Sequence, residues 1–146
     1  GADVSSGLGW QQRRDVLVKS NVEADIPEEC PSDGLILKPI NSDDIKIGVW
    51  IMPNNNNNGM LEDFAAFLIP DDDKLLPEVE NVLDSIEARG LNKYKPIHHS
   101  KAKIHTWLAW QEDPGTPMGS AVTKKYLTTT PPICQAFVNW LNALYN

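Results

Sequence analysis

The chain has 146 residues, of which 41% are hydrophobic, and this suffices for one ordinary core, so we expect a single domain spanning residues 1–146. Twenty acidic residues against thirteen Lys and Arg give a net charge of −7, which disfavours non-specific binding of nucleic acid. No apolar run approaches the ~20 residues of a membrane-spanning helix, and Cys30 and Cys134 stand far apart, so we expect a cytoplasmic protein without membrane contact, zinc knuckle or disulfide framework.

The first half of the chain predicts a helix and then a β-hairpin. Residues at near-helical spacing predict a helix from Leu8 to Lys19, and a loop rich in proline and acids follows it. Two runs of β-type residues, Leu35–Lys38 and Ile45–Met52, are close enough along the chain to pair as a hairpin. The asparagines Asn54–Asn58 break the second strand, and we interpret them as a flexible surface loop in preference to the polar rim of a site.

The second half of the chain is mainly helical. The expected helices are Gly59–Leu68, Leu76–Ile86 with Asp71–Asp73 starting it and Gly90 ending it, Ser100–Gln111, Ala121–Leu127, and Ile133–Leu144 with Pro131 and Pro132 at its start. Together with the hairpin they predict an α/β fold in which a short β-hairpin or small sheet packs with about five helices. Because an isolated hairpin is marginal in water and no strand opens the chain, we expect the C-terminal part of a longer protein.

Two adjacent acids are candidates for metal ligands. Glu62 and Asp63 lie in the first turn of the helix that follows the asparagines, and helical geometry separates their side chains by ~100°. They fit one metal ion or two. The structural alternative is that they complement the helix dipole, with Glu62, three residues after Gly59, as the acid of a capping box.

A basic segment without acids is the best candidate for an anion site. Its cationic and imidazole side chains are Lys93, Lys95, His98, His99, Lys101, Lys103 and His105. Lys101 and His105, four residues apart, share one helical face, while Lys103 and Trp107 share another, so these groups suit a phosphate beside an aromatic ring. The alternatives are a solvated basic face and, with less support from ligand spacing, a metal site at the two neighbouring histidines.

Several motifs together resemble a known family. They are Lys46–Pro53, Asn58–Phe64, Ser100–Gln111, Pro117–Gly119 and Phe137–Leu141. In these segments the chain resembles the bacterial family catalogued as domain of unknown function 3226, which is Toprim-like. The resemblance covers nearly the whole chain and implies a partial Toprim-like domain that lacks the first strand of the family.

The resemblance also implies a set of site residues. Toprim enzymes hold Mg²⁺ with an early glutamate and an Asp-x-Asp pair, and only Asp3 of Gly1-Ala2-Asp3 matches this pattern. In related nucleases a later Gly-x-Leu-Glu acid and a downstream lysine complete the site, which implies Glu62 and Lys101 or Lys103. We therefore predict Asp3, Glu62 and Asp63 as ligands of Mg²⁺ or Mn²⁺, and Lys101, Lys103 and His105 as catalytic residues.

Three hypotheses on function follow. By resemblance, the full-length protein is a Mg²⁺-dependent nuclease or phosphotransfer enzyme acting on nucleic acid, and this fragment alone is inactive. The alternative is a non-catalytic module that docks on a partner protein such as an ATPase, suggested by the many helices and by Trp107, Trp110 and Trp140. A third hypothesis is binding of a small anion by residues 93–105, and exposed apolar surface makes a homo-oligomer an added expectation.

Overall fold

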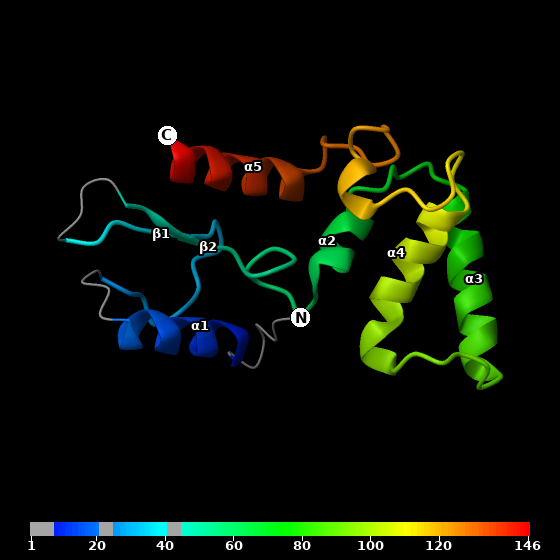
Figure 1. Cartoon of the computed structure of the whole chain (residues 1–146), viewed down its shortest axis with the longest axis horizontal. Coiled ribbons are helices and arrows are strands. Elements are labelled where there is room, and N and C mark those ends of the chain that lie inside the picture. Colours follow the sequence, from blue (N-terminus) through cyan, green and yellow to red (C-terminus); the bar gives the residue numbers. More distant parts are fainter. Residues whose placement is uncertain (1–7, 21–24, 41–44) are drawn as a thin grey trace. The chain divides into compact units, whose positions relative to one another are not determined.

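The computed structural model describes residues 8–20, 25–40 and 45–146, so Asp3 lies outside the described residues. The chain divides into two compact units (Figure 1). The first unit comprises residues 1–64 and 132–146, and the second comprises residues 65–131. Whether they act as one domain stays a prediction. Across the described ranges, no helix is both long and apolar enough to cross a membrane.

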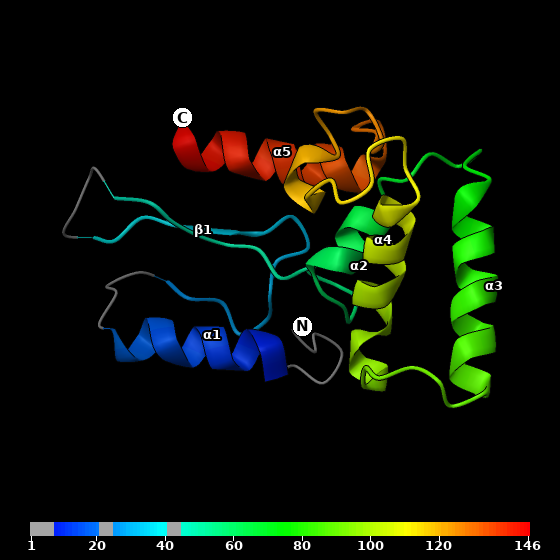
Figure 2. The same ribbon diagram turned by 45° about the vertical axis from the view of Figure 1, so that its right-hand side comes forward.

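The first unit is a hairpin between two helices. β1 (Leu35–Leu37) and β2 (Ile47–Val49) pair in antiparallel fashion, which confirms the predicted hairpin with strands shorter than expected. α1 (Leu8–Lys19), whose bounds are those predicted, lies on one side of the hairpin, and α5 (Pro132–Tyr145) lies on the other (Figures 1 and 2). Successive strand residues point to opposite faces of the hairpin, so one face packs against α1 and the other against α5.

The face of the hairpin toward α1 forms a small hydrophobic core. Trp10 of α1 is buried with Leu35 and Leu37, the alternate residues of β1. The indole Nε1 of Trp10 donates a hydrogen bond to the carbonyl oxygen of Glu28 at 2.7 Å. Burial of each such side chain stabilises the fold by about 1.5–3 kcal/mol. The tryptophan therefore joins α1 both to the hairpin and to the loop that follows α1.

The face of the hairpin toward α5 is shaped by a glycine. A Cβ on Gly48 would lie 2.6 Å from Cδ2 of Leu144 and 2.7 Å from Cζ2 of Trp140, so only glycine allows α5 this close. Trp140 also donates its indole N–H to the carbonyl oxygen of Leu35 at 3.2 Å. Its ring stacks on that of Phe137, with centroids 5.7 Å apart. The closing helix that the apolar stripe predicted is thus confirmed.

The second unit contains a pair of helices. α3 (Leu75–Ala88) and α4 (His99–Ala109) pack against each other. On each helix the side chains at the contact are spaced three or four residues apart along the chain. The 3₁₀ turn η1 (Pro96–His98) leads directly into α4. The buried side chains are Val79 and Leu83 on α3 and Ile104, Trp107 and Leu108 on α4. Gly90 ends α3 as predicted, because it has φ 64° and Leu91 N–H donates to Ile86 O at 3.0 Å.

The start of α3 depends on one carboxylate. Oδ1 of Asp73 accepts hydrogen bonds from the backbone N–H groups of Leu75 at 2.9 Å and Leu76 at 2.7 Å. The same oxygen accepts the indole N–H of Trp107 at 3.2 Å. The predicted helix-starting role of Asp71–Asp73 therefore belongs to Asp73, which also ties α4 to the beginning of α3.

The helix after the asparagines is shorter than predicted. α2 (Leu61–Ala66) ends before Leu68, whose N–H donates to Ala65 O in a turn at 3.0 Å. Pro70 disfavours the helical conformation in the residue before it, so the helix cannot extend to that point. Leu68 is nevertheless buried, so its apolar character reflects the core and not a helix face.

The prediction of a helix at Ala121–Leu127 is wrong. This stretch follows the 3₁₀ turn η2 (Met118–Ser120) and forms turns without an α-helix. Lys125 has φ 61°, and Tyr126 N–H donates to Ala121 O at 2.9 Å, which is the closing pattern of a helix end after a single turn. Among the described residues, five α-helices and a two-stranded sheet remain, which confirms the predicted small α/β fold.

Candidate functional site

The two candidate acids lie in the first turn of α2, as predicted. Oδ2 of Asp63 accepts the backbone N–H of Met60, the residue before the helix, at 2.7 Å. Asp63 is therefore the acid of the capping box, a position that the sequence assigned to Glu62 by counting from Gly59. A Cβ on Gly59 would lie 2.8 Å from the same Oδ2, so the glycine leaves room for this carboxylate.

The asparagine segment is a hydrogen-bonded turn with one buried residue, Asn55, so the prediction of a flexible surface loop is wrong for that residue. This residue is 1% exposed and has φ 62°, a left-handed conformation that asparagine tolerates. Its Oδ1 accepts the N–H of Ile51 at 2.7 Å, and its Nδ2 donates to the carbonyl oxygen of Ser32 at 3.1 Å. The turn therefore fixes the backbone that leads into α2 and its acids.

The basic segment forms a hollow in the surface of the second unit. Its volume is about 390 Å³, within the range of small-molecule sites, and it is open to solvent. It is lined by Tyr94, His98, Lys101, Ala102 and His105, and we call it the α4 hollow. Lys101 and His105 line it together, which confirms that they share a helical face. The first turn of α4 contains no acidic residue.

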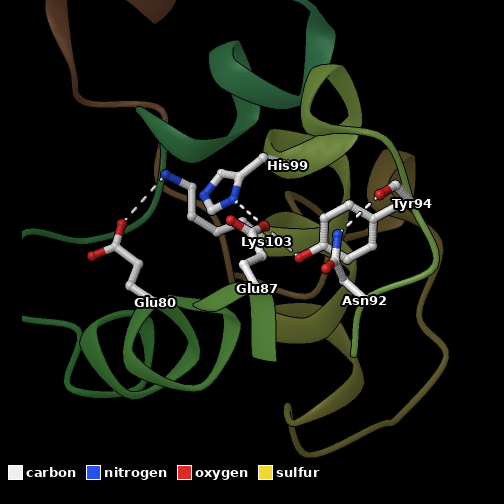
Figure 3. Close-up of polar contacts among 6 residues, drawn as sticks. All are labelled: Glu80, Glu87, Asn92, Tyr94, His99 and Lys103. Atoms are coloured by element: carbon white, nitrogen blue, oxygen red, sulfur yellow. Dashed lines mark hydrogen bonds and ion pairs between the residues drawn. The ribbon is translucent and has the colours of Figure 1, made fainter. Parts of the chain in front are cut away.

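Tyr94 is held in place by Glu87 (Figure 3). The Tyr94 hydroxyl donates to Oε1 of Glu87 at 2.6 Å, and Nδ1 of His99 lies 2.7 Å from the same oxygen. A carboxylate only accepts hydrogen bonds, so Nδ1 of His99 carries the proton here. Nδ2 of Asn92 donates to the backbone carbonyl of Tyr94 at 3.0 Å. The side chain and the backbone of Tyr94 are therefore both fixed.

These hydrogen bonds also change the acidity of the groups that form them. The hydrogen bonds from Tyr94 and then from His99 lower the pKa of Glu87 below its ordinary value, because both favour the ionised carboxylate. The hydrogen bond to Glu87 raises the pKa of Tyr94 to about 12. Tyr94 therefore keeps its proton, and with it its contact to Glu87, over the whole physiological range.

Lys103 lies apart from the α4 hollow. Its Nζ forms an ion pair with Oε1 of Glu80 on α3 at 3.3 Å. Figure 3 marks this contact. Trp107 is only 1% exposed and belongs to the core between the helices. The prediction that Trp107 presents its ring to a ligand is therefore wrong, because the face that it shares with Lys103 turns toward α3. The aromatic ring beside Lys101 is that of Tyr94.

Of the predicted site residues, the structure brings together Lys101 and His105. Glu62 and Asp63 belong to the first unit and the lysines to the second, so the position of the acids relative to the cations stays a prediction. Asp3 lies outside the described residues. Within residues 8–20, 25–40 and 45–146, no three or more His, Cys, Asp or Glu side chains gather as metal ligands. The metal-binding role of these acids remains a prediction.

Tyr94 and Glu87 belong to the candidate site but were not predicted from the sequence. Glu87 lies on α3 and meets Tyr94 across the turn at Gly90. The two are seven residues apart, but the helix ends between them, so helical spacing does not predict their contact. A local signal did exist for His98, which precedes His105 by seven residues, or about two helical turns. We expected the helix to begin at Ser100, whereas α4 begins at His99 and the 3₁₀ turn η1 directly before it contains His98.

Comparison with known proteins gives one match. No curated protein and no solved structure matches the chain. The model of the family described as "Protein of unknown function (DUF3226)" matches residues 2–146. This range includes the segments Lys46–Pro53 and Ser100–Gln111, on which the resemblance rested. The chain therefore belongs to the DUF3226 family.

Proposed function

We propose that the protein binds phosphate groups of nucleic acid in the α4 hollow. The observation that carries the proposal is that His98, Lys101 and His105 line one open hollow. A lysine ammonium attracts phosphate as a compact charge, and imidazole N–H groups donate hydrogen bonds to its oxygens. Because the net charge of −7 repels nucleic acid at long range, binding requires a local cationic site of this kind.

We further propose that phosphate binding serves a nuclease or phosphotransfer reaction that depends on Mg²⁺ or Mn²⁺, by the resemblance to Toprim enzymes. Asp3, Glu62 and Asp63 would hold the metal ion, whose charge would stabilise the reacting phosphate. Carboxylate oxygens are ligands that Mg²⁺ prefers, and Asp63 can still accept from other groups because one hydrogen bond occupies only part of its capacity. Lys101 would steady the phosphate.

Binding is tested by measuring fluorescence anisotropy of a labelled single-stranded oligonucleotide without metal. Lys101→Ala is expected to weaken binding at least about tenfold, as loss of a charged hydrogen bond does. The matched control is Lys95→Ala, which removes the same charge from the same basic segment at an exposed residue that does not line the hollow. Equal losses in both variants would contradict a site in the hollow and favour a solvated basic face.

Catalysis is tested by a nicking assay of the full-length protein with Mg²⁺ or Mn²⁺. Glu62→Gln is expected to lower the rate at least about a hundredfold, because a metal ion contributes several kcal/mol to the transition state. Oligonucleotide binding without metal should not change. Glu78→Gln is the control, since Glu78 is an exposed acid in the first turn of α3. A full-length protein that is inert, or insensitive to Glu62→Gln, would contradict the catalytic proposal.

One observation favours the alternative of docking on a partner protein such as an ATPase. Trp110 at the end of α4 is 45% exposed, whereas Trp107 and Trp140 are explained by the cores. Tryptophan is enriched among residues that dominate binding energy at interfaces. Trp110→Ala should then abolish recovery of the partner in a pull-down, while Ile97→Ala, at a residue 66% exposed, should not. Light scattering of both variants distinguishes a second copy of the chain from another protein.

A further inference from the structure

The basic side chains of the α4 hollow form a row. His98, Lys101 and His105 follow one another at intervals of three and four residues. At the helical rise of 1.5 Å per residue, the row is about 10 Å long. A nucleic-acid strand in a duplex carries one phosphate for about every 3.4 Å of helix axis. The row is therefore longer than one phosphate group and suits a ligand with phosphates in series.

The hollow also provides apolar surface beside this row. Tyr94 and Ala102 line it together with His98, Lys101 and His105. An aromatic ring stacks on the flat face of a nucleobase, and every base offers such a face. In a duplex these faces are already covered by neighbouring bases, so only an unstacked base of a single strand can use the ring.

The ring of Tyr94 is prepared for this contact before a ligand arrives. Its hydroxyl is fixed by Oε1 of Glu87 at 2.6 Å, and its backbone is fixed by Asn92 at 3.0 Å (Figure 3). His99 holds the same oxygen of Glu87 from its other side at 2.7 Å. A side chain that is already ordered loses little further entropy on binding, so its contact adds more affinity.

We propose that the α4 hollow holds one unstacked nucleotide of a single-stranded nucleic acid. Its base lies against Tyr94, and the phosphates on either side lie along His98, Lys101 and His105. Glu87 acts as a positioning residue through Tyr94. This inference rests on the proposed phosphate binding and adds to it the strand state of the ligand and the need for a base.

The first experiment uses the wild-type protein alone. Anisotropy measures its affinity for a labelled single strand, for the same strand with abasic nucleotides, and for the corresponding duplex, in both DNA and RNA. The ordinary single strand is expected to bind about fivefold to a hundredfold more tightly than the abasic strand, which is the range that base stacking on an aromatic ring provides. It is also expected to bind more tightly than the duplex.

The second experiment uses variants of Tyr94. Tyr94→Leu should lower the affinity for the ordinary strand to that for the abasic strand and leave abasic binding unchanged. Tyr94→Phe keeps the ring but loses the hydrogen bond to Glu87, so a smaller loss is expected. Tyr145→Leu is the matched control, because Tyr145 is 80% exposed on α5, away from the hollow residues in sequence and in another unit. Circular dichroism and thermal melts verify that each variant folds.

The outcomes separate this inference from the proposal on which it rests. If the wild-type protein binds ordinary and abasic strands equally, or prefers the duplex, the nucleotide inference is overturned. In that case, continued sensitivity to Lys101→Ala still supports phosphate binding in the hollow. If Lys101→Ala also has no effect beyond that of Lys95→Ala, both proposals fail.

Discussion

Replacement of Asn55 by alanine is expected to destabilise the protein by about 2–5 kcal/mol, although the residue lies in a run of five asparagines. Its Oδ1 is the acceptor for the N–H of Ile51, a residue that is 4% exposed, so alanine leaves a buried donor unpaired. An unpaired buried donor costs about 1–3 kcal/mol. Alanine at φ 62° adds about 1–2 kcal/mol of left-handed strain.

Urea unfolding measured by circular dichroism and by tryptophan fluorescence gives this difference from the midpoint at constant slope. Asn57→Ala is the control, because Asn57 is exposed and the side-chain acceptor of its own N–H is Asn54; it should cost less than about 0.5 kcal/mol. Asn55→Gly loses the same hydrogen bonds without the strain, so it should be less destabilising than Asn55→Ala. Equal stability of the Asn55→Ala and Asn57→Ala variants would refute the reasoning.

Four further results are expected. Gly34→Ala should cost at least about 2 kcal/mol in urea unfolding, because φ is 84° and its Cβ would lie 2.5 Å from Cδ1 of Trp140; a neutral effect would contradict this packing. Tyr94 should ionise with a pKa of about 12, so the stability from its hydrogen bond is complete below the ordinary tyrosine pKa and is lost as the pH rises through 12. This titration is measured as the difference in ultraviolet absorbance between the wild-type protein and the Tyr94→Phe variant as the pH rises. The Glu87 carboxylate should contribute stability at pH values above the ordinary glutamate pKa, and this contribution should be lost as the pH falls through the lowered pKa of Glu87. The melting temperatures of the wild-type protein and Glu87→Gln should therefore differ at neutral pH and converge at acidic pH. Lys103→Ala should cost less than about 1 kcal/mol, as partly exposed ion pairs do, and should weaken oligonucleotide binding less than Lys101→Ala does.

Periodic spacing predicted the parts of the fold that depend on it. α1 begins and ends where the sequence indicated, and α3 ends at Gly90 because a left-handed residue there has a recognisable sequence preference. Lys125 has a similar backbone conformation but no such preference, so the turn that it closes was mistaken for a helix. Asn55 shows the same limit, because nothing in a run of identical residues indicates which one is buried.

Only the part of the candidate site that lies on a single helix could be predicted from the sequence. Lys101 and His105 are four residues apart, and this spacing alone places them on one face. Tyr94 meets Glu87 through a contact between a loop and the preceding helix, which no sequence period describes. Trp107 was taken for the exposed ring because its spacing from Lys103 is helical, but spacing does not tell which face turns toward the core.

The salt dependence of single-strand binding tests the central claim, phosphate binding in the α4 hollow, most directly. In a plot of the logarithm of the association constant against the logarithm of the salt concentration, each phosphate contact contributes about 0.7 to the magnitude of the slope. Lys101→Ala is therefore predicted to reduce the slope by about 0.7, while Lys95→Ala leaves it unchanged. The same slope for the wild-type protein and the Lys101→Ala variant would show that Lys101 contacts no phosphate and would contradict the account.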